Sequence, residues 1–125
     1  MLRALPFVLV AAVAAVATAS SPSRLRVNVT GTYTSNWDQV KLVQEGTRVT
    51  GTYVCCGGGT ITGRIVEGRV LKFHWSEPRG AGEGEGVWTI EQNGRLDGTW
   101  GHGQSESDGG PWTLVLKAKA GQIAN

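Results

Sequence analysis

Residues 29–53, VTGTYTSNWDQVKLVQEGTRVTGTY, contain the pattern that predicts the fold. The pentapeptide VTGTY stands at both ends, and in each copy Val, Gly and Tyr alternate with Thr. A two-residue alternation is typical of a β-strand with one buried face. Another apolar-rich run, around 39–44, is joined to the second copy by the short turn EGT at 45–47. We therefore expect a strand, a longer connection, a strand, a tight turn and a third strand.

The same unit recurs further along the chain, as LKFHW at 71–75 and LDGTW at 96–100. From this alternation we predict eight short strands, at about 27–34, 39–44, 48–54, 60–66, 69–75, 86–91, 95–100 and 112–117. Tight turns alternate with longer connections, which are expected at 35–38, 55–59, 76–85 and 101–111. In an up-and-down meander, alternate connections lie at the same end of the sheet. Three tight turns should therefore share one end and four loops the other.

Eight sequential antiparallel strands predict an all-β domain over residues 27–117. Closure into an up-and-down barrel removes the exposed strand edges that favour aggregation. The alternative is a two-sheet sandwich. Glycines recur within the strands, and tightly curved sheets need glycine at such positions. The fold prediction is therefore an eight-stranded antiparallel up-and-down barrel.

The first 19 residues predict a secretory signal peptide. Arg3 precedes an almost wholly apolar run, and Ala17-Thr18-Ala19 has the small-x-small pattern of a cleavage site. An uncleaved anchor is the alternative. Residues 20–26 are expected to be an N-terminal linker and 118–125 a flexible tail. We expect the protein to be secreted or periplasmic, with no membrane-spanning segment after cleavage.

Charge excludes some classes of partner. The chain has 12 Lys+Arg and 10 Asp+Glu. Without Arg3, 12 − 1 = 11 cations face 10 anions, a net charge of +1. The charges alternate in sign, so no basic patch for nucleic acid is expected. The 19 glycines are spaced between β-branched residues and indicate strand punctuation rather than a disordered linker.

The topology predicts that aromatic side chains gather beneath the loop end. Four of them close a strand just before a long connection and two open a strand just after one. All six should point inward at one height: Tyr33, Tyr53, Trp75, Trp88, Trp100 and Trp112. The connection at 35–38 adds rim groups, namely Ser35, Asn36 and Trp37. These rings either fill the interior as core or form an aromatic cup that binds one small ligand.

Cys55 and Cys56 are the only cysteines and precede three glycines. Neighbouring Cα atoms are about 3.8 Å apart, less than the usual ~4.4–6.8 Å across a disulfide. A bond between them would rigidify the loop, and the glycines could accommodate the unusual backbone. Bonds to another chain and free thiols are the alternatives. Redox catalysis is not expected, because there is no Cys-x-x-Cys spacing or adjacent base.

No catalytic or metal-binding constellation is evident, so we expect neither an enzyme nor a cofactor. His74 is expected to face outward, and His102 lies near Glu106 and Asp108 without a recognised metal-ligand spacing. The glutamates at 77, 83 and 85 could act as an acid–base pair, but a glycine-rich loop would hold them poorly.

Several motifs resemble a group of small exported, largely uncharacterised β-barrel proteins with Thr-Gly-Thr-Tyr/Trp repeats. They are the two VTGTY copies, WSEP at 75–78, GTWG at 98–101 and GGPW at 109–112. This resemblance covers most of residues 29–117 and implies a fold but no activity. The opening is also similar in shape to avidins, whose barrel holds biotin in an aromatic box. That resemblance implies that Ser35 and Asn36, which follow Gly31-Thr32-Tyr33, are polar ligand contacts.

Three functions are consistent with these expectations. The first is an exported, non-catalytic protein that binds a small flat or sugar-like ligand at the loop end. The second is a protein-binding module, such as an enzyme inhibitor, that uses Trp37 and the 76–85 loop. The third is an envelope or matrix component that is cross-linked through Cys55 and Cys56.

Overall fold

The computed structural model describes residues 27–80 and 82–119. The predicted signal peptide, the predicted linker and residues 120–125 of the predicted tail lie outside this part. In chain order, the elements are β1 (Gly31–Ser35), β2 (Val40–Glu45), β3 (Arg48–Tyr53), the short 3₁₀ turn η1 (Cys55–Gly57), β4 (Gly59–Val66), β5 (Val70–Glu77), β6 (Gly82–Ile90), the 3₁₀ turn η2 (Gln92–Gly94), β7 (Arg95–His102) and β8 (Gly110–Lys119). Within the described residues, no helix is long and apolar enough to cross a membrane.

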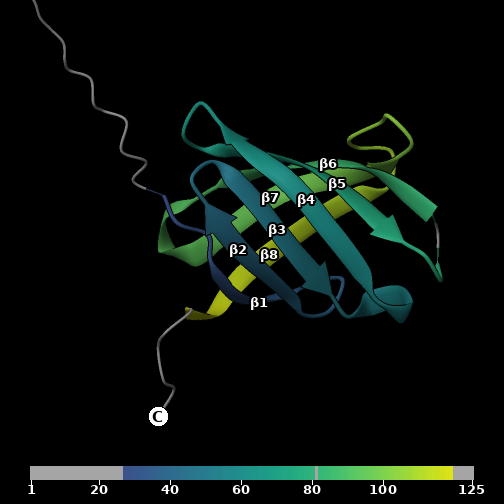
Figure 1. The fold of residues 1–125 in the computed structure, drawn as a ribbon, viewed down its shortest axis with the longest axis horizontal. Helices are drawn as coiled ribbons and strands as arrows, with labels where there is room; N and C mark the ends of the chain where they lie inside the picture. The colour runs from purple at the N-terminus through teal and green to yellow at the C-terminus, as the bar shows by residue number, and fades with distance from the viewer. Residues whose placement is uncertain (1–26, 81, 120–125) are drawn as a thin grey trace, which may run out of the picture.

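Every strand pairs antiparallel with the next, and β1 also pairs with β8. The sheet is thus a closed eight-stranded up-and-down barrel (Figure 1). This confirms the predicted fold. The sandwich alternative is wrong, because the β1–β8 ladder joins what would have been two free edges.

The two ends of the barrel differ as expected. The β2–β3, β4–β5 and β6–β7 turns lie together at the left of Figure 1, where β1 begins and β8 ends. The four longer connections gather at the right. The pairs Glu67-Gly68 and Asn93-Gly94 have positive φ at both residues, which is the backbone that two-residue hairpin turns require. We call the right-hand side of the barrel the loop end.

Strands β5 and β6 are longer than predicted, and the connection between them is correspondingly shorter. β6 begins at Gly82 and not at 86, so its alternating glycines lie within the strand and not in a loop. Gly84 and Gly86 are buried, and a Cβ on Gly86 would lie 2.2 Å from the Phe73 ring. These glycines make room for aromatic rings of β5. Strand β8 also extends to Lys119, two residues into the predicted tail.

The middle of the barrel is filled by three aromatic rings, which we call the aromatic plug: Phe73, Trp88 and Trp112. Phe73 and Trp88 stack with their centroids 4.0 Å apart, and Trp112 meets both rings edge-on. All three side chains are buried, and each contributes roughly 2–3 kcal/mol through the hydrophobic effect. The plug closes the interior below the loop end.

Candidate functional site

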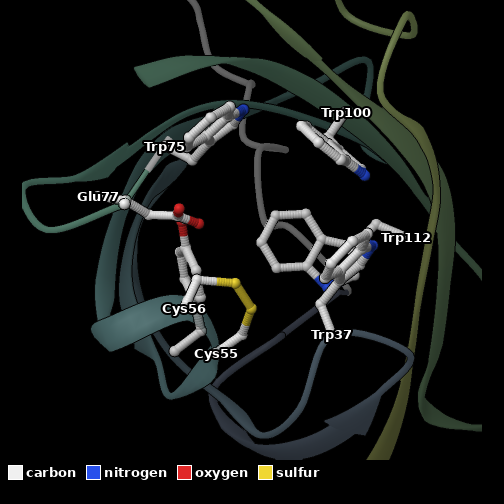
Figure 2. A pocket seen from close by; sticks show the side chains of 9 residues that line it. Trp37, Cys55, Cys56, Trp75, Glu77, Trp100 and Trp112 are labelled. Atoms are coloured by element: carbon white, nitrogen blue, oxygen red, sulfur yellow. A yellow bond between two sulfur atoms is a disulfide. The ribbon is translucent and has the colours of Figure 1, made fainter. Parts of the chain in front are cut away.

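A cavity of about 360 Å³ opens at the loop end of the barrel (Figure 2). Its lining comes from strands β3, β5, β7 and β8 and from three of the four long connections. The lining residues are Trp37, Tyr53, Cys55, Cys56, Trp75, Glu77, Gly80, Trp100 and Trp112. Four of the five tryptophans of the chain are among them.

Strand alternation directs these side chains inward. On β5 the buried positions are Leu71, Phe73, Trp75 and Glu77, at strict two-residue spacing. The strand therefore contributes one ring to the aromatic plug, one to the cavity wall and a carboxylate to the mouth. This spacing was visible in the sequence. Glu77 was missed because the glycine-rich stretch after it suggested that the strand ended at 75.

The aromatic walls stand nearly perpendicular to one another. Trp37 and Trp75 each meet Trp100 edge-to-face, with centroids 5.5 Å apart and ring planes at 87° and 81°. Tyr53 meets Trp112 in the same way, at 5.2 Å and 82°. Edge-to-face contact is a favourable geometry for the ring quadrupoles. Because of these perpendicular contacts, the rings that line the cavity have different orientations.

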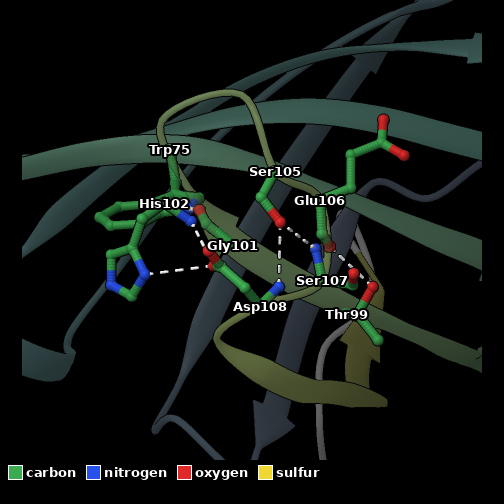
Figure 3. Close-up of polar contacts among 8 residues, drawn as sticks. All are labelled: Trp75, Thr99, Gly101, His102, Ser105, Glu106, Ser107 and Asp108. Carbon is green, nitrogen blue, oxygen red and sulfur yellow. Dashed lines mark hydrogen bonds and ion pairs between the residues drawn. The ribbon is translucent and has the colours of Figure 1, made fainter.

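Most of the indole N–H groups are used within the protein. Trp75 Nε1 donates to the carbonyl oxygen of Gly101 over 3.0 Å (Figure 3). Trp112 Nε1 donates to Ser35 Oγ over 3.2 Å, and Trp37 Nε1 donates to the carbonyl of Pro111 over 3.3 Å. Trp100 Nε1 is buried and has no hydrogen-bond partner within the described residues. An unpaired buried donor costs about 1–3 kcal/mol.

Glu77 is the buried carboxylate of the site. Its side chain is 8% exposed, and Oε2 accepts a hydrogen bond from the Tyr53 hydroxyl over 2.6 Å. Burial raises the pKa of Tyr53 well above its ordinary value of 10, and the hydrogen bond and negative charge of Glu77 raise it further. Tyr53 therefore stays a neutral donor that orients the carboxylate.

The loop that contains the cysteines forms one side of the rim. Cys55 and Cys56 are joined by a disulfide, with their Cα atoms 3.7 Å apart (Figure 2). Cys56, Gly57 and Gly58 all have positive φ, between 68° and 97°. The neighbouring β5–β6 connection approaches closely, since a Cβ on Gly80 would lie 2.6 Å from Glu77 Oε1 and 3.0 Å from the Cys56 carbonyl. The two connections therefore close the rim together.

Five of the nine predicted site residues line the cavity: Trp37, Tyr53, Trp75, Trp100 and Trp112. Trp88 does not. It lies in the aromatic plug, where its Nε1 donates to the carbonyl of Trp112 over 3.0 Å. The prediction of six rings at one height is wrong for Trp88, because β6 begins six residues before it rather than two.

Tyr33 is the second ring that the structure places elsewhere. Its hydroxyl donates to the Val29 carbonyl over 2.7 Å, so the side chain runs toward the tight-turn end. There it lines a separate hollow of about 490 Å³ together with Arg69, Glu91 and Leu116. Burial raises the pKa of Tyr33 to about 12.

Ser35 and Asn36 hold the β1–β2 connection against β8. Asn36 donates to the Pro111 carbonyl over 2.9 Å and accepts from the Thr113 amide over 2.8 Å. Ser35 Oγ accepts from the Trp37 amide and donates to the Asp38 carbonyl. Neither residue lines the cavity. Both position aromatic side chains rather than face a ligand.

The β7–β8 connection is also held by internal hydrogen bonds (Figure 3). Asp108 Oδ1 accepts from the His102 amide over 2.8 Å and lies 3.2 Å from His102 Nδ1. Ser105 Oγ accepts from the amides of Ser107 and Asp108, and Thr99 Oγ1 donates to the Glu106 carbonyl. In the part of the chain that is described, no group of three or more His, Cys, Asp or Glu side chains is placed to hold a metal ion.

Comparisons with known proteins add no family to this description. No protein-family model matches the chain, and neither a curated protein nor a solved structure matches it significantly. The resemblances to exported repeat barrels and to avidins therefore stay predictions. The function has to be inferred from the geometry of the site.

Proposed function

We propose that this protein is an exported, non-catalytic binding protein that holds a small flat or sugar-like ligand in the loop-end cavity. The observation that carries the proposal is the cavity itself, which is walled by five aromatic side chains in the mouth of a closed barrel. Its volume of about 360 Å³ is within the ~300–1,000 Å³ of ordinary small-molecule sites. Eight-stranded barrels are also the size that can hold one small ligand.

Two further features support a ligand here. The walls are supplied by the barrel strands and by connections with internal hydrogen bonds, so the cavity exists before a ligand arrives. Preformed walls reduce the entropy lost on binding. The lining is mostly apolar and aromatic, as in ordinary small-molecule sites, and the Glu77 carboxyl and the Tyr53 hydroxyl add polar groups that can orient a ligand.

A ligand screen monitored by calorimetry and tryptophan fluorescence tests the proposal. Saturable binding should be lost or weakened in Trp37→Ala and Trp100→Ala. Val43→Ala is the matched control, because Val43 is an exposed apolar residue that does not line the cavity. Trp88→Phe should retain the ligand-dependent fluorescence change, since Trp88 lies in the plug. A broad screen without saturable binding to folded wild-type protein would contradict the proposal.

Export is part of the proposal and rests on residues 1–19. The mature protein should begin at Ser20 and should be found outside the cytoplasm. N-terminal sequencing of the fractionated native protein measures both properties. An intact residue 1 in a cytoplasmic fraction would overturn this part without affecting the cavity.

We also propose that the Cys55–Cys56 bond forms in the exported protein and shapes the rim. Intact mass of the unreduced monomer should be lower than that of the reduced monomer by the mass of two hydrogens, and thiol alkylation should occur only after reduction. The proposal is supported by the contact between the two sulfurs, and a component cross-linked through them is the alternative. A dimer that separates on reduction would restore that alternative.

A protein-binding module is the second candidate function. It is favoured by apolar side chains that are exposed at the loop end, Trp37 at 38% and Val54 at 56%. Such side chains suit a protein partner. Affinity capture from the native compartment should then recover one partner with wild type, and less of it with Trp37→Ala and Val54→Ser. Equal recovery with both variants would count against this candidate.

A further inference from the structure

We infer that the cavity is selective for a small organic cation, and specifically for one whose positive charge is on a methylated ammonium group. This inference rests on the proposed function and names the class of ligand. It follows from three observations: the charge of the lining, the arrangement of the rings, and the scarcity of acceptors in the walls.

The lining carries negative charge and no positive charge. Glu77 is its only acidic residue, and no Lys, Arg or His is among the described residues that line the cavity. Arg79, in the same connection as Gly80, is exposed and its side chain lies against Gly57. A carboxylate at the mouth of an apolar cavity attracts a cation more strongly than it would in water, because the surrounding dielectric constant is lower.

Aromatic rings line the same cavity as Glu77. A positive charge over the face of Trp, the most favourable partner, or of Tyr is stabilised by the ring quadrupole. Here Trp75 and Trp37 stand at 81° and 87° to Trp100, so the aromatic walls have at least two orientations. Perpendicular walls suit a rounded group that meets several faces, as an alkylated ammonium does.

The scarcity of acceptors favours a methylated ammonium over a primary amine. A primary ammonium has three N–H donors, and each needs an acceptor when it is buried. Apart from the Glu77 carboxylate and the Tyr53 hydroxyl, the side chains that line the cavity are indoles and a disulfide, which are poor acceptors. A quaternary ammonium has no N–H, so it loses less on leaving water.

The experiment compares four probes by isothermal titration calorimetry at matched ionic strength: choline, tetramethylammonium, ethanolamine and 3,3-dimethylbutan-1-ol. The last is the uncharged carbon counterpart of choline, with the same shape. We expect choline and tetramethylammonium to bind saturably. The affinity of the neutral alcohol should be lower than that of choline by about tenfold or by a larger factor. Ethanolamine should also bind more weakly than choline.

Glu77→Gln should remove the preference for choline over the neutral alcohol, while Glu45→Gln should leave it unchanged. Glu45 is an exposed glutamate at the tight-turn end of β2, so both variants lose one negative charge. If Glu77→Gln does not fold, the comparison of choline with the neutral alcohol in wild-type protein still tests the inference. Trp37→Leu at the rim should then lower the affinity for choline more than the affinity for the alcohol.

Equal affinities for choline and its neutral counterpart would overturn the inference, and so would the absence of any cation binding. Unchanged choline selectivity in folded Glu77→Gln would do the same. None of these results contradicts the proposed function, which then depends on whether uncharged ligands saturate the cavity in the wider screen. Failure of that screen as well would overturn both.

Discussion

The hydroxyl of Tyr53 and the carboxylate of Glu77 form a 2.6 Å hydrogen bond inside the barrel mouth, although 24 residues separate them in the chain. The bond links the end of β3 to the end of β5, two strands that are separated by β4. Both side chains line the cavity and both are buried. The bond therefore affects stability as well as the charge that a ligand would meet.

Tyr53→Phe should lower the free energy of unfolding by about 1.5–3 kcal/mol, because it removes a donor to a charged acceptor. Tyr33→Phe is the matched comparison, since the Tyr33 hydroxyl donates to a neutral backbone carbonyl. Its cost should be smaller, about 0.5–1.5 kcal/mol. Urea unfolding measures both variants. A Tyr33 variant that is less stable than the Tyr53 variant would contradict this assignment.

Alkaline titration should reveal both tyrosines as buried. The folded pKa of Tyr33 is raised from 10 to about 12, and that of Tyr53 is raised as well, chiefly by burial. For a raised pKa, the stabilising contribution is complete below pH 10 and is lost as the pH rises toward the folded value. The ultraviolet absorbance of phenolate should therefore stay low in native protein at pH 10–11, whereas urea-unfolded protein titrates near 10. Half-ionisation of native protein at pH 10 would be inconsistent with the buried positions.

His74 should titrate above its ordinary pKa of 6.5. Its Nδ1 lies 2.9 Å from Glu85 Oε2 and its Nε2 lies 2.9 Å from Glu83 Oε1, on the outer face of β5 and β6. The hydrogen bond to Glu85 is the largest cause of the raised pKa, burial opposes it, and Glu83 adds to it. The imidazolium therefore stabilises the fold fully below pH 6.5, and this contribution is lost as the pH rises through the raised pKa. Histidine NMR titration should show the pKa falling in Glu85→Gln, and an unchanged value would contradict the assignment.

Gly86→Ala should destabilise the barrel by about 1–3 kcal/mol or more, because its Cβ would overlap the Phe73 ring. Phe73→Leu removes that ring edge. In a double-mutant cycle, the double variant should therefore lose less stability than the sum of the two single losses. Chemical unfolding of the four proteins measures the coupling. Strict additivity would show that the ring does not require glycine at this position.

Strand alternation and turn type were sufficient to predict the strands, their order and the gathering of long connections at one end. They were also sufficient for most of the cavity wall, because Tyr53, Trp75, Trp100 and Trp112 occupy inward positions near strand ends. They failed at the start of β6, where glycines recur at every second residue. Gly80, Gly82 and Gly84 suggested a loop over 76–85, which placed Trp88 too high and Glu77 outside the barrel. A glycine that makes room for a ring on the next strand looks, in the sequence, like one that ends a strand.

By itself, then, the amino-acid sequence determined a barrel with unlike ends and an aromatic mouth, because side-chain period and turn length are local properties of the chain. Only the tertiary structure decided which rings share the cavity and that Glu77 lies among them. It also decided that Ser35 and Asn36 hold the β1–β2 connection and do not line the cavity. The physical reason is that barrel strands tilt and are staggered against their neighbours, so equal positions in two strands lie at different heights. Rotamer choice adds to this, as the Tyr33 ring shows by turning back toward Val29.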